Sequence, residues 1–181
     1  MNLSIDLVLT IPNKNHQNEA IDFIQEFLYY NSYLAGTASL HHYINNYEEW
    51  LHKLENDLNN YETNDVPRTT YFAIRESDNR IIGITNIRHK LNDWYLLKGG
   101  HIGFAVRPTE RQKGYGTKIL SLGLKRCKEL GIRKVLIVCD KENICSSKVI
   151  INNNGILENE IEDDEIDNIS GIKQRYWINI K

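Results

Sequence analysis

The stretch Val106–Thr117, VRPTERQKGYGT, joins a predicted strand to a predicted helix and decides how the rest of the chain is interpreted. Pro108 ends the strand, because a proline nitrogen has no hydrogen to donate to a neighbouring strand. Two glycines follow where a helix begins, near Gln112. Unpaired N–H groups of a first helical turn attract an anion, and glycines let the backbone approach a phosphate closely. Arg111 and Lys113 add positive charge, so the stretch predicts an anion-binding loop, unless the glycines only shape a turn.

Two other phosphate-binding motifs do not fit. A P-loop requires GxxxxGK followed by Ser or Thr, whereas the order from Gly114 onward is Gly-Tyr-Gly-Thr-Lys. A dinucleotide-binding fingerprint requires GxGxxG between a strand and a helix. Gly99, Gly100 and Gly103 lack that spacing and lie at the start of a predicted strand or within it. A Walker-type nucleotide site is therefore not expected, and the dinucleotide interpretation is discarded.

Hydrophobic periodicity in the rest of the chain predicts a single domain of mixed α+β class over residues 1–181. Apolar and polar residues alternate from Leu3 to Leu9, as in a half-buried strand. Apolar residues recur at steps of three and four from Leu40 to Leu58, as in an amphipathic helix. In order, the prediction is a strand at 3–9, helices at 17–30 and 40–58, strands at 71–74, 80–89 and 101–106, a helix from about 112 to 131, a strand at 134–139, a helix at 143–152, and strands at 156–161 and 174–180.

Composition and charge exclude several classes of protein. With 181 residues, 41% of them hydrophobic and 25% charged, the chain has the composition of an ordinary globular protein. Its formal net charge of -2 lacks the basic excess of a general nucleic-acid binder. The cysteines, Cys127, Cys139 and Cys145, form no CxxC pair, and no spaced His/Cys cluster indicates a metal site. We therefore expect neither a disulfide framework nor a bound metal.

The beginning of the chain and its hydropathy indicate where the protein acts. No targeting signal is recognised, because Ser4 and Asp6 interrupt the first apolar residues and no basic region precedes them. No window approaches the roughly 18 apolar residues that a membrane span requires. The sequence therefore predicts a cytoplasmic protein that does not enter a membrane.

Two linked motifs resemble the GCN5-related N-acetyltransferase superfamily. Arg111–Gly116, RQKGYG, is similar to that family's signature of Arg or Gln, two residues, Gly, one residue, and Gly or Ala. Further along the chain, Asn143–Ser146 is similar to the family's Asn-x-x-Ala/Ser helix start. The resemblance implies an acyl-CoA N-acyltransferase fold, with a mixed, mostly antiparallel central sheet flanked by helices. It also implies an acceptor-side variable part over residues 3–66 and an acetyl-CoA-binding core over residues 71–155.

The same resemblance implies where acetyl-CoA, the co-substrate of the family, would bind. Backbone N–H groups from Gln112 to Thr117 would hold its pyrophosphate, and the strand at Ala105–Arg107 would pair with its pantetheine arm. The N–H of Val106 would polarise the thioester carbonyl. Asn143 would hydrogen-bond the pantetheine arm, although it could equally cap the following helix. The cofactor-binding residues expected in this way are Ala105, Val106, Arg107, Arg111, Gln112, Lys113, Gly114, Tyr115, Gly116, Thr117, Asn143 and Ser146.

Amine acetylation also requires a base, because the attacking nitrogen must lose a proton. Many family members carry a Glu at the start of the fourth strand, where this sequence has His101. An ordinary histidine pKa of about 6.5 suits a base near neutrality, so His101, acting directly or through water, is the predicted catalytic residue. A packed strand histidine is the alternative, and His89 is the second candidate. The family's usual acid, a Tyr, corresponds to Ile150 here, so another group or solvent would protonate the leaving thiolate.

The acceptor is expected to be a small-molecule or peptide amine. Acidic residues crowd the segment from Glu158 to Asp167, in the predicted connection between the last two strands. The resemblance implies that this connection can border the acceptor entrance, where it would attract a polyamine, an aminoglycoside or a lysine side chain, unless it is only a solvated loop. Four tyrosines near the first helix could line an acceptor pocket or belong to the core: Tyr29, Tyr30, Tyr33 and Tyr43.

One rival function and one question of assembly stay open at this point. A non-catalytic acyl-CoA-binding or regulatory module is favoured by the absent tyrosine and disfavoured by the intact loop and by His101. An exposed final strand, such as Tyr176–Ile178, could pair with a second copy in a homodimer.

Overall fold

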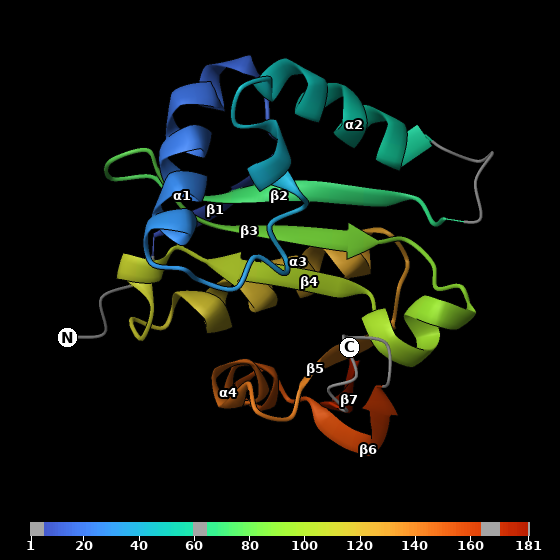
Figure 1. Cartoon of the computed structure of the whole chain (residues 1–181). Coiled ribbons are helices and arrows are strands. Elements are labelled where there is room, and N and C mark those ends of the chain that lie inside the picture. The colour runs from blue at the N-terminus through green and yellow to red at the C-terminus, as the bar shows by residue number, and fades with distance from the viewer. Residues whose placement is uncertain (1–5, 60–64, 164–170, 181) are drawn as a thin grey trace.

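The computed structural model describes residues 6–59, 65–163 and 171–180 (Figure 1). Its strands form two antiparallel sheets, one with the order β1-β2-β3-β4 and one with the order β5-β7-β6. The strands are β1 (Leu7–Thr10), β2 (Arg68–Arg75), β3 (Arg80–Arg88), β4 (Ile102–Val106), β5 (Lys134–Asp140), β6 (Ile156–Asp163) and β7 (Gly171–Asn179). The α-helices are α1 (Gln17–Tyr29), α2 (Tyr47–Asn59), α3 (Tyr115–Glu129) and α4 (Ile144–Asn152). Shorter helical turns cover Lys14–His16, Leu40–Tyr43, Tyr95–Gly99 and Pro108–Glu110.

Helices cover both faces of the four-stranded sheet (Figure 1). α1 and α2 pack on one face, where Phe23 and Trp50 are fully buried together with Phe72 of β2. α3 packs on the other face, where Ile119 contacts the cluster that contains Ile82 of β3. Because successive strand residues point to opposite faces, β2 and β3 supply apolar side chains to both layers. The α+β class predicted from the sequence is confirmed.

The helix predicted over 40–58 is wrong at its beginning. Leu40–Tyr43 form a short 3-10 turn, and α2 begins only at Tyr47. The side chain of Asn46 accepts a hydrogen bond from the Glu49 N–H at 3.2 Å, and this cap starts the helix after Asn46. Leu40, the first residue of the turn, is fully buried. The apolar spacing therefore continues across the break between the turn and α2, and the sequence does not reveal the break.

The last two strands correct two further expectations. β6 extends to Asp163, so the first part of the acidic run lies within a strand, and residues 164–167 lie outside the described residues. β7 lies between β5 and β6, and its Tyr176 and Ile178 are buried. The final strand is therefore not an exposed edge, and the expected pairing of two copies through Tyr176–Ile178 is wrong.

The other elements form where the periodicity predicts them, with shifts at their ends. The strand predicted at 3–9 corresponds to β1, and residues 3–5 lie outside the described residues. β2 already begins at Arg68, and α3 begins at Tyr115 rather than near Gln112. The strand expected from His101 begins at Ile102. In the part of the chain that the structure describes, no helix is both long enough and apolar enough to cross a membrane.

Candidate active site

β4 and β5 meet at one end and separate toward the other, and a cavity lies between them. At the closed end, the His101 N–H donates to the Leu136 carbonyl at 2.7 Å, and the Leu136 N–H donates to His101 Nδ1 at 2.9 Å. Beyond this point the two strands belong to separate sheets. The cavity, of about 170 Å³, lies between Ile102–Phe104 and Ile137–Asp140. Its lining is completed by the loop after α1, the start of α4 and one residue of β7, namely Tyr33, Ala35, Gly36, Asn143, Ser146 and Lys173.

The strand residues expected to pair with pantetheine do not all face the open edge of β4. The Arg107 N–H donates to the Ile82 carbonyl of β3 at 2.8 Å. Hydrogen-bonding direction alternates along an antiparallel strand, so Ala105 also faces β3, whereas Val106 between them faces away from it. The Val106 carbonyl accepts from Arg111 Nε at 3.1 Å, which agrees with this orientation. Of the three, Val106 is the residue that can present its backbone to a ligand.

Arg107 has its polar groups engaged within the protein. Its fully buried guanidinium donates to three carboxylates of α1. These are Glu19, Asp22 and Glu26, at 2.7, 2.6 and 3.0 Å. The Arg107 carbonyl accepts from the Glu110 N–H at 3.0 Å. The expectation that Arg107 contacts the cofactor is therefore corrected, because neither its side chain nor its backbone reaches the open edge of β4.

The loop after β4 has the backbone geometry of an anion site. Gln112 and Gly114 adopt positive φ angles of 62° and 83°, which turn the chain into α3. α3 begins at Tyr115, and among the described residues no side chain caps it. The first bond within the helix runs from the Lys118 N–H to the Gly114 carbonyl at 3.2 Å, so the N–H groups from Tyr115 to Thr117 have no partner within the helix. Together with the positive end of the helix dipole, they fit a pyrophosphate.

The cations beside this loop are present, and each is held by a protein partner. Arg111 lies over the Phe27 ring, 5.4 Å from its centroid, and burial lowers the pKa of its guanidinium. Lys113 Nζ donates to Glu110 at 2.9 Å. The Tyr115 hydroxyl accepts a hydrogen bond from Arg75 of β2 at 3.0 Å. The backbone N–H groups of the loop, rather than these side chains, are therefore the groups most available to an anion.

Gly116 brings the start of α3 close to two other elements. A Cβ at this position would lie 3.0 Å from Val149 Cγ2 of α4 and 3.6 Å from Val106 Cγ2 of β4. The next residue, Thr117, accepts a hydrogen bond at its carbonyl from Asn153 Nδ2 at 3.1 Å. A side chain at this position would therefore crowd Val149 at the junction of β4, α3 and α4.

The start of α4 borders the cavity. Asn143 Oδ1 accepts from the Ser146 N–H at 3.0 Å, so the predicted helix cap is confirmed. The cap uses only the oxygen of the amide, which leaves the Asn143 nitrogen for the expected contact with a pantetheine arm. Ile150 is fully buried and supplies no proton at the position of the family's tyrosine.

His101 lies at the closed end of the cavity and is 8% exposed. Burial lowers the pKa of His101 to about 4, so the imidazole is neutral at pH 7. Its Nδ1 accepts the Leu136 N–H, so the single proton of the neutral imidazole lies on Nε2, which can donate a hydrogen bond but cannot take a proton. The predicted role of His101 as the base therefore does not fit this arrangement. His89, the second candidate, lies at the end of β3 with its Nε2 2.8 Å from Thr69 Oγ1. A catalytic role for either histidine stays a prediction.

A charged pair in the cavity could not be predicted from sequence spacing. Lys173 of β7 is hydrogen-bonded to Asp140 of β5, and its Nζ lies 3.5 Å from Asp163 Oδ2. The pairing of β5 with β7 sets Asp140 opposite Lys173, and this register appears only in the folded sheet. Within the described ranges, no three His, Cys, Asp or Glu side chains gather as a metal site would require.

Of the residues suggested for acceptor binding, Tyr33 lines the cavity, whereas Tyr43 packs against the core under α1 and α2. Tyr29 and Tyr30 are exposed. Acidic residues of β6 are mostly paired with cations, which reduces their attraction for a charged acceptor. The pairs are Glu158 with Arg175 at 2.6 Å, Glu160 with Lys141 at 2.7 Å and Asp163 with Lys98 at 2.9 Å.

Solved structures share this fold. A ribosomal L7/L12 α-N-protein acetyltransferase in complex with coenzyme A is 15% identical, with a TM-score of 0.71 over 98% of this chain and 96% of that chain. The Microcin C7 self immunity acetyltransferase, in complex with acetyl-CoA and AMP, is 16% identical, with a TM-score of 0.69 over 99% and 96%. The spermidine/spermine N-acetyltransferase of Vibrio cholerae is 13% identical, with a TM-score of 0.65 over 97% and 95%.

A comparison with curated proteins found no match. Residues 18–154 match the family model described as the acetyltransferase (GNAT) domain. This match extends over most of the chain and includes the loop after β4, α3 and the start of α4. The chain therefore belongs to the GNAT acetyltransferase family and is an acetyl-CoA-dependent N-acetyltransferase.

Proposed function

We propose that the protein transfers an acetyl group to a primary amine held in the cavity between β4 and β5. The proposal rests on backbone groups that, among the described residues, have no partner within α3 or the sheet and that lie one after another, from the start of α3 past Val106 to the cavity. The uncapped start of α3 offers N–H groups to an anion, and the neighbouring Val106 turns its backbone away from β3. The path continues to the cavity bordered by Asn143 and Ser146.

In this proposal each part of the path has one task. Acetyl-CoA supplies an activated acetyl thioester. The N–H groups from Tyr115 to Thr117 hold its pyrophosphate, and the Asn143 amide binds the pantetheine arm. The Val106 N–H donates to the thioester carbonyl, where negative charge develops during attack by the amine.

We further propose that His101 acts through a water molecule: its Nε2–H donates a hydrogen bond that positions the water beside the acceptor, and this water takes the proton of the attacking amine. The pKa of about 4 keeps the imidazole in this neutral form at pH 7. The hydrogen bond from the Leu136 N–H to Nδ1 holds the ring in one orientation. The acceptor is a small-molecule or peptide amine, and the paired carboxylates of β6 give no preference for a strongly cationic one.

Mass spectrometry of incubations with acetyl-CoA tests this function. Polyamines, aminoglycosides, amino acids and peptides are offered as acceptors, and we expect an acetylated product from one class. With that acceptor, His101→Asn should lower turnover by about tenfold and leave the affinity for acetyl-CoA unchanged. Unchanged turnover would exclude a catalytic role for His101. Acetyl-CoA binding without any product would contradict the proposed transfer to an amine of these four classes.

A further inference from the structure

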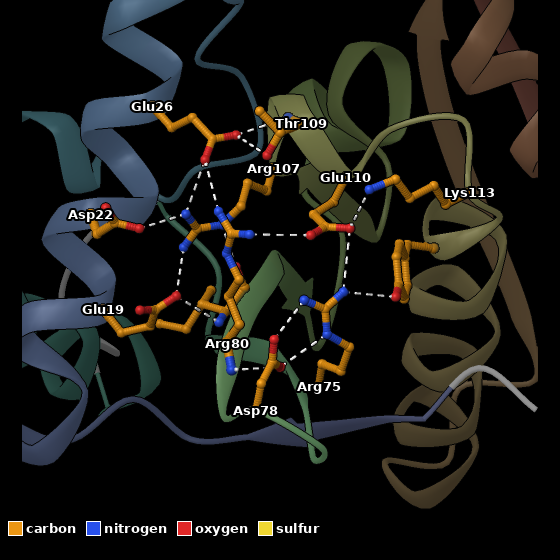
Figure 2. Close-up of polar contacts among 12 residues, drawn as sticks. Glu19, Asp22, Glu26, Arg75, Asp78, Arg80, Arg107, Thr109, Glu110 and Lys113 are labelled. Atoms are coloured by element: carbon orange, nitrogen blue, oxygen red, sulfur yellow. Dashed lines mark hydrogen bonds and ion pairs between the residues drawn. The ribbon is translucent and has the colours of Figure 1, made fainter.

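A network of charged side chains around the buried Arg107 joins α1 to the loop that precedes α3 (Figure 2). At its centre lies the Arg107 guanidinium, whose Nε donates to the Ile81 carbonyl at 2.7 Å. Its other nitrogens donate to Glu19, Asp22 and Glu26. These carboxylates recur at helical spacing and so lie on one face of α1. α1 is thus fixed to the end of β4 by hydrogen-bonded charges as well as by apolar packing.

Glu26 extends this network to the turn before the loop. Its Oε1 accepts from both the N–H and the hydroxyl of Thr109, each at 2.8 Å. Its Oε2 accepts from Arg107 at 3.0 Å and from Arg80 at 3.3 Å. Burial opposes ionisation, but the hydrogen bonds from Thr109 and Arg107 lower the pKa of Glu26 below its ordinary value. One charged carboxylate therefore joins the last turn of α1 to the turn Pro108–Glu110.

Glu110 holds the loop from its other side, and its side chain is only 6% exposed. Its Oε1 accepts from Arg80 at 3.3 Å, and its Oε2 accepts from Lys113 at 2.9 Å. Arg75 Nη1 lies 3.3 Å from the same Oε2 and also donates to the Tyr115 hydroxyl at 3.0 Å. Glu110 thus contacts Lys113 within the loop and Arg75, as Figure 2 shows. Arg75 in turn holds Tyr115, the first residue of α3.

The loop that Glu26 and Glu110 hold, residues 111–116, includes a backbone conformation that is unfavourable by itself. Gln112 has a φ of 62°, a left-handed conformation that a residue with a side chain adopts only when its surroundings impose it. Glu26 holds the residue Thr109 before this position, and Glu110 holds Lys113 after it. A loop that already has its bound conformation loses less conformational entropy when a ligand binds.

We propose that Glu26 and Glu110 are positioning residues for acetyl-CoA, which keep residues 111–116 in the conformation that holds the pyrophosphate. The inference rests on the proposed assignment of that loop as the pyrophosphate site. Neither carboxylate contacts the ligand in this proposal, because Glu26 acts through Thr109, and Glu110 acts through Lys113 and Arg75.

The test combines an affinity with a measure of loop mobility. Calorimetry gives the Kd for CoA, and NMR relaxation gives backbone order parameters for residues 111–116 in the ligand-free protein. Glu26→Ala and Glu110→Ala should each raise the Kd by about tenfold. Both should lower the order parameters of the loop from about 0.85 toward 0.6 and leave those of the strands unchanged. The matched control is Asp22→Ala, because Asp22 binds the same Arg107 guanidinium and, among the described residues, contacts no part of the loop.

Thr109→Val gives a second comparison, because it removes the hydroxyl bond to Glu26 and leaves all the carboxylates around Arg107. Its Kd and loop order parameters should lie between those of the wild type and Glu26→Ala. The proposal is overturned if Glu26→Ala and Glu110→Ala change the Kd and the loop no more than Asp22→Ala does. It is also overturned if order is lost equally throughout the sheet, since that is a general structural effect. If the wild type does not bind CoA, the site assignment fails, while the order parameters still report whether the carboxylates hold the loop.

Discussion

Replacing Arg107 with methionine should lower the free energy of unfolding by about 3–5 kcal/mol. The fully buried guanidinium is the shared partner of Glu19, Asp22 and Glu26 and of the Ile81 carbonyl. A methionine fills similar space but donates no hydrogen bond, so Glu26, whose side chain is 13% exposed, and the more exposed Glu19 and Asp22 lose their counter-charge. Urea denaturation at neutral pH measures the loss.

Arg126→Met is the matched control for this substitution. Arg126 pairs with Glu129 at 2.8 Å on the surface of α3, where both side chains are exposed. An exposed pair of this kind contributes at most about 1 kcal/mol. If Arg107→Met costs no more stability than Arg126→Met, the network around Arg107 does not stabilise the fold as described.

Acidification should destabilise the protein through His101 by up to about 3 kcal/mol. Burial lowers the pKa of His101 to about 4 in the folded state, whereas an unfolded histidine titrates near 6.5. Below pH 6.5 the unfolded chain therefore binds a proton that the folded protein does not, so unfolding is favoured. The contribution of His101 is fully present above pH 6.5 and is lost as the pH falls toward 4.

The variant His101→Asn isolates this effect. Its amide oxygen can accept the Leu136 N–H in place of Nδ1 but does not titrate, so stability should fall less between pH 6.5 and 4 than in the wild type. His52→Asn, at an exposed position of α2, controls for the loss of one histidine. Burial also lowers the pKa of His16, His41 and His89, but these residues stay in all the proteins and cancel in the difference. Equal pH slopes for His101→Asn and the wild type would contradict the account.

Local chemistry made part of the site predictable from the sequence. A proline that ends a strand, a glycine loop and an amphipathic helix in succession predict an uncapped helix start, and the structure has this geometry from Pro108 to Thr117. The cap formed by Asn143 was predictable for the same reason, because it depends on residues three positions apart. The helical and strand periods likewise identified most elements.

The features of the site that could not be predicted depend on contacts between residues far apart in the sequence. Arg107 was expected at the ligand because the family resemblance places the strand Ala105–Arg107 beside the pantetheine arm, but the pairing of β4 with β3 turns alternate residues away from the open edge. Its partners on α1 are far away in the sequence and have no motif that links them to it. The contact between Lys173 and Asp140 likewise depends on the register of β5 and β7. His101 has an ordinary pKa in the unfolded chain, and only burial between the two sheets lowers it.

The most direct test of the central claim, that the loop before α3 binds acetyl-CoA, is a calorimetric titration of acetyl-CoA into three proteins. Gly114→Ala and Gly131→Ala both place an alanine at a positive φ, 83° and 80°, so both should lose about 1 kcal/mol of stability. Gly131 lies after the far end of α3, where an added Cβ meets no atom within 4 Å. We predict that the wild type and Gly131→Ala bind acetyl-CoA alike and that Gly114→Ala binds it about tenfold more weakly or worse. No binding by the wild type, or equal binding by all three proteins, would contradict the account.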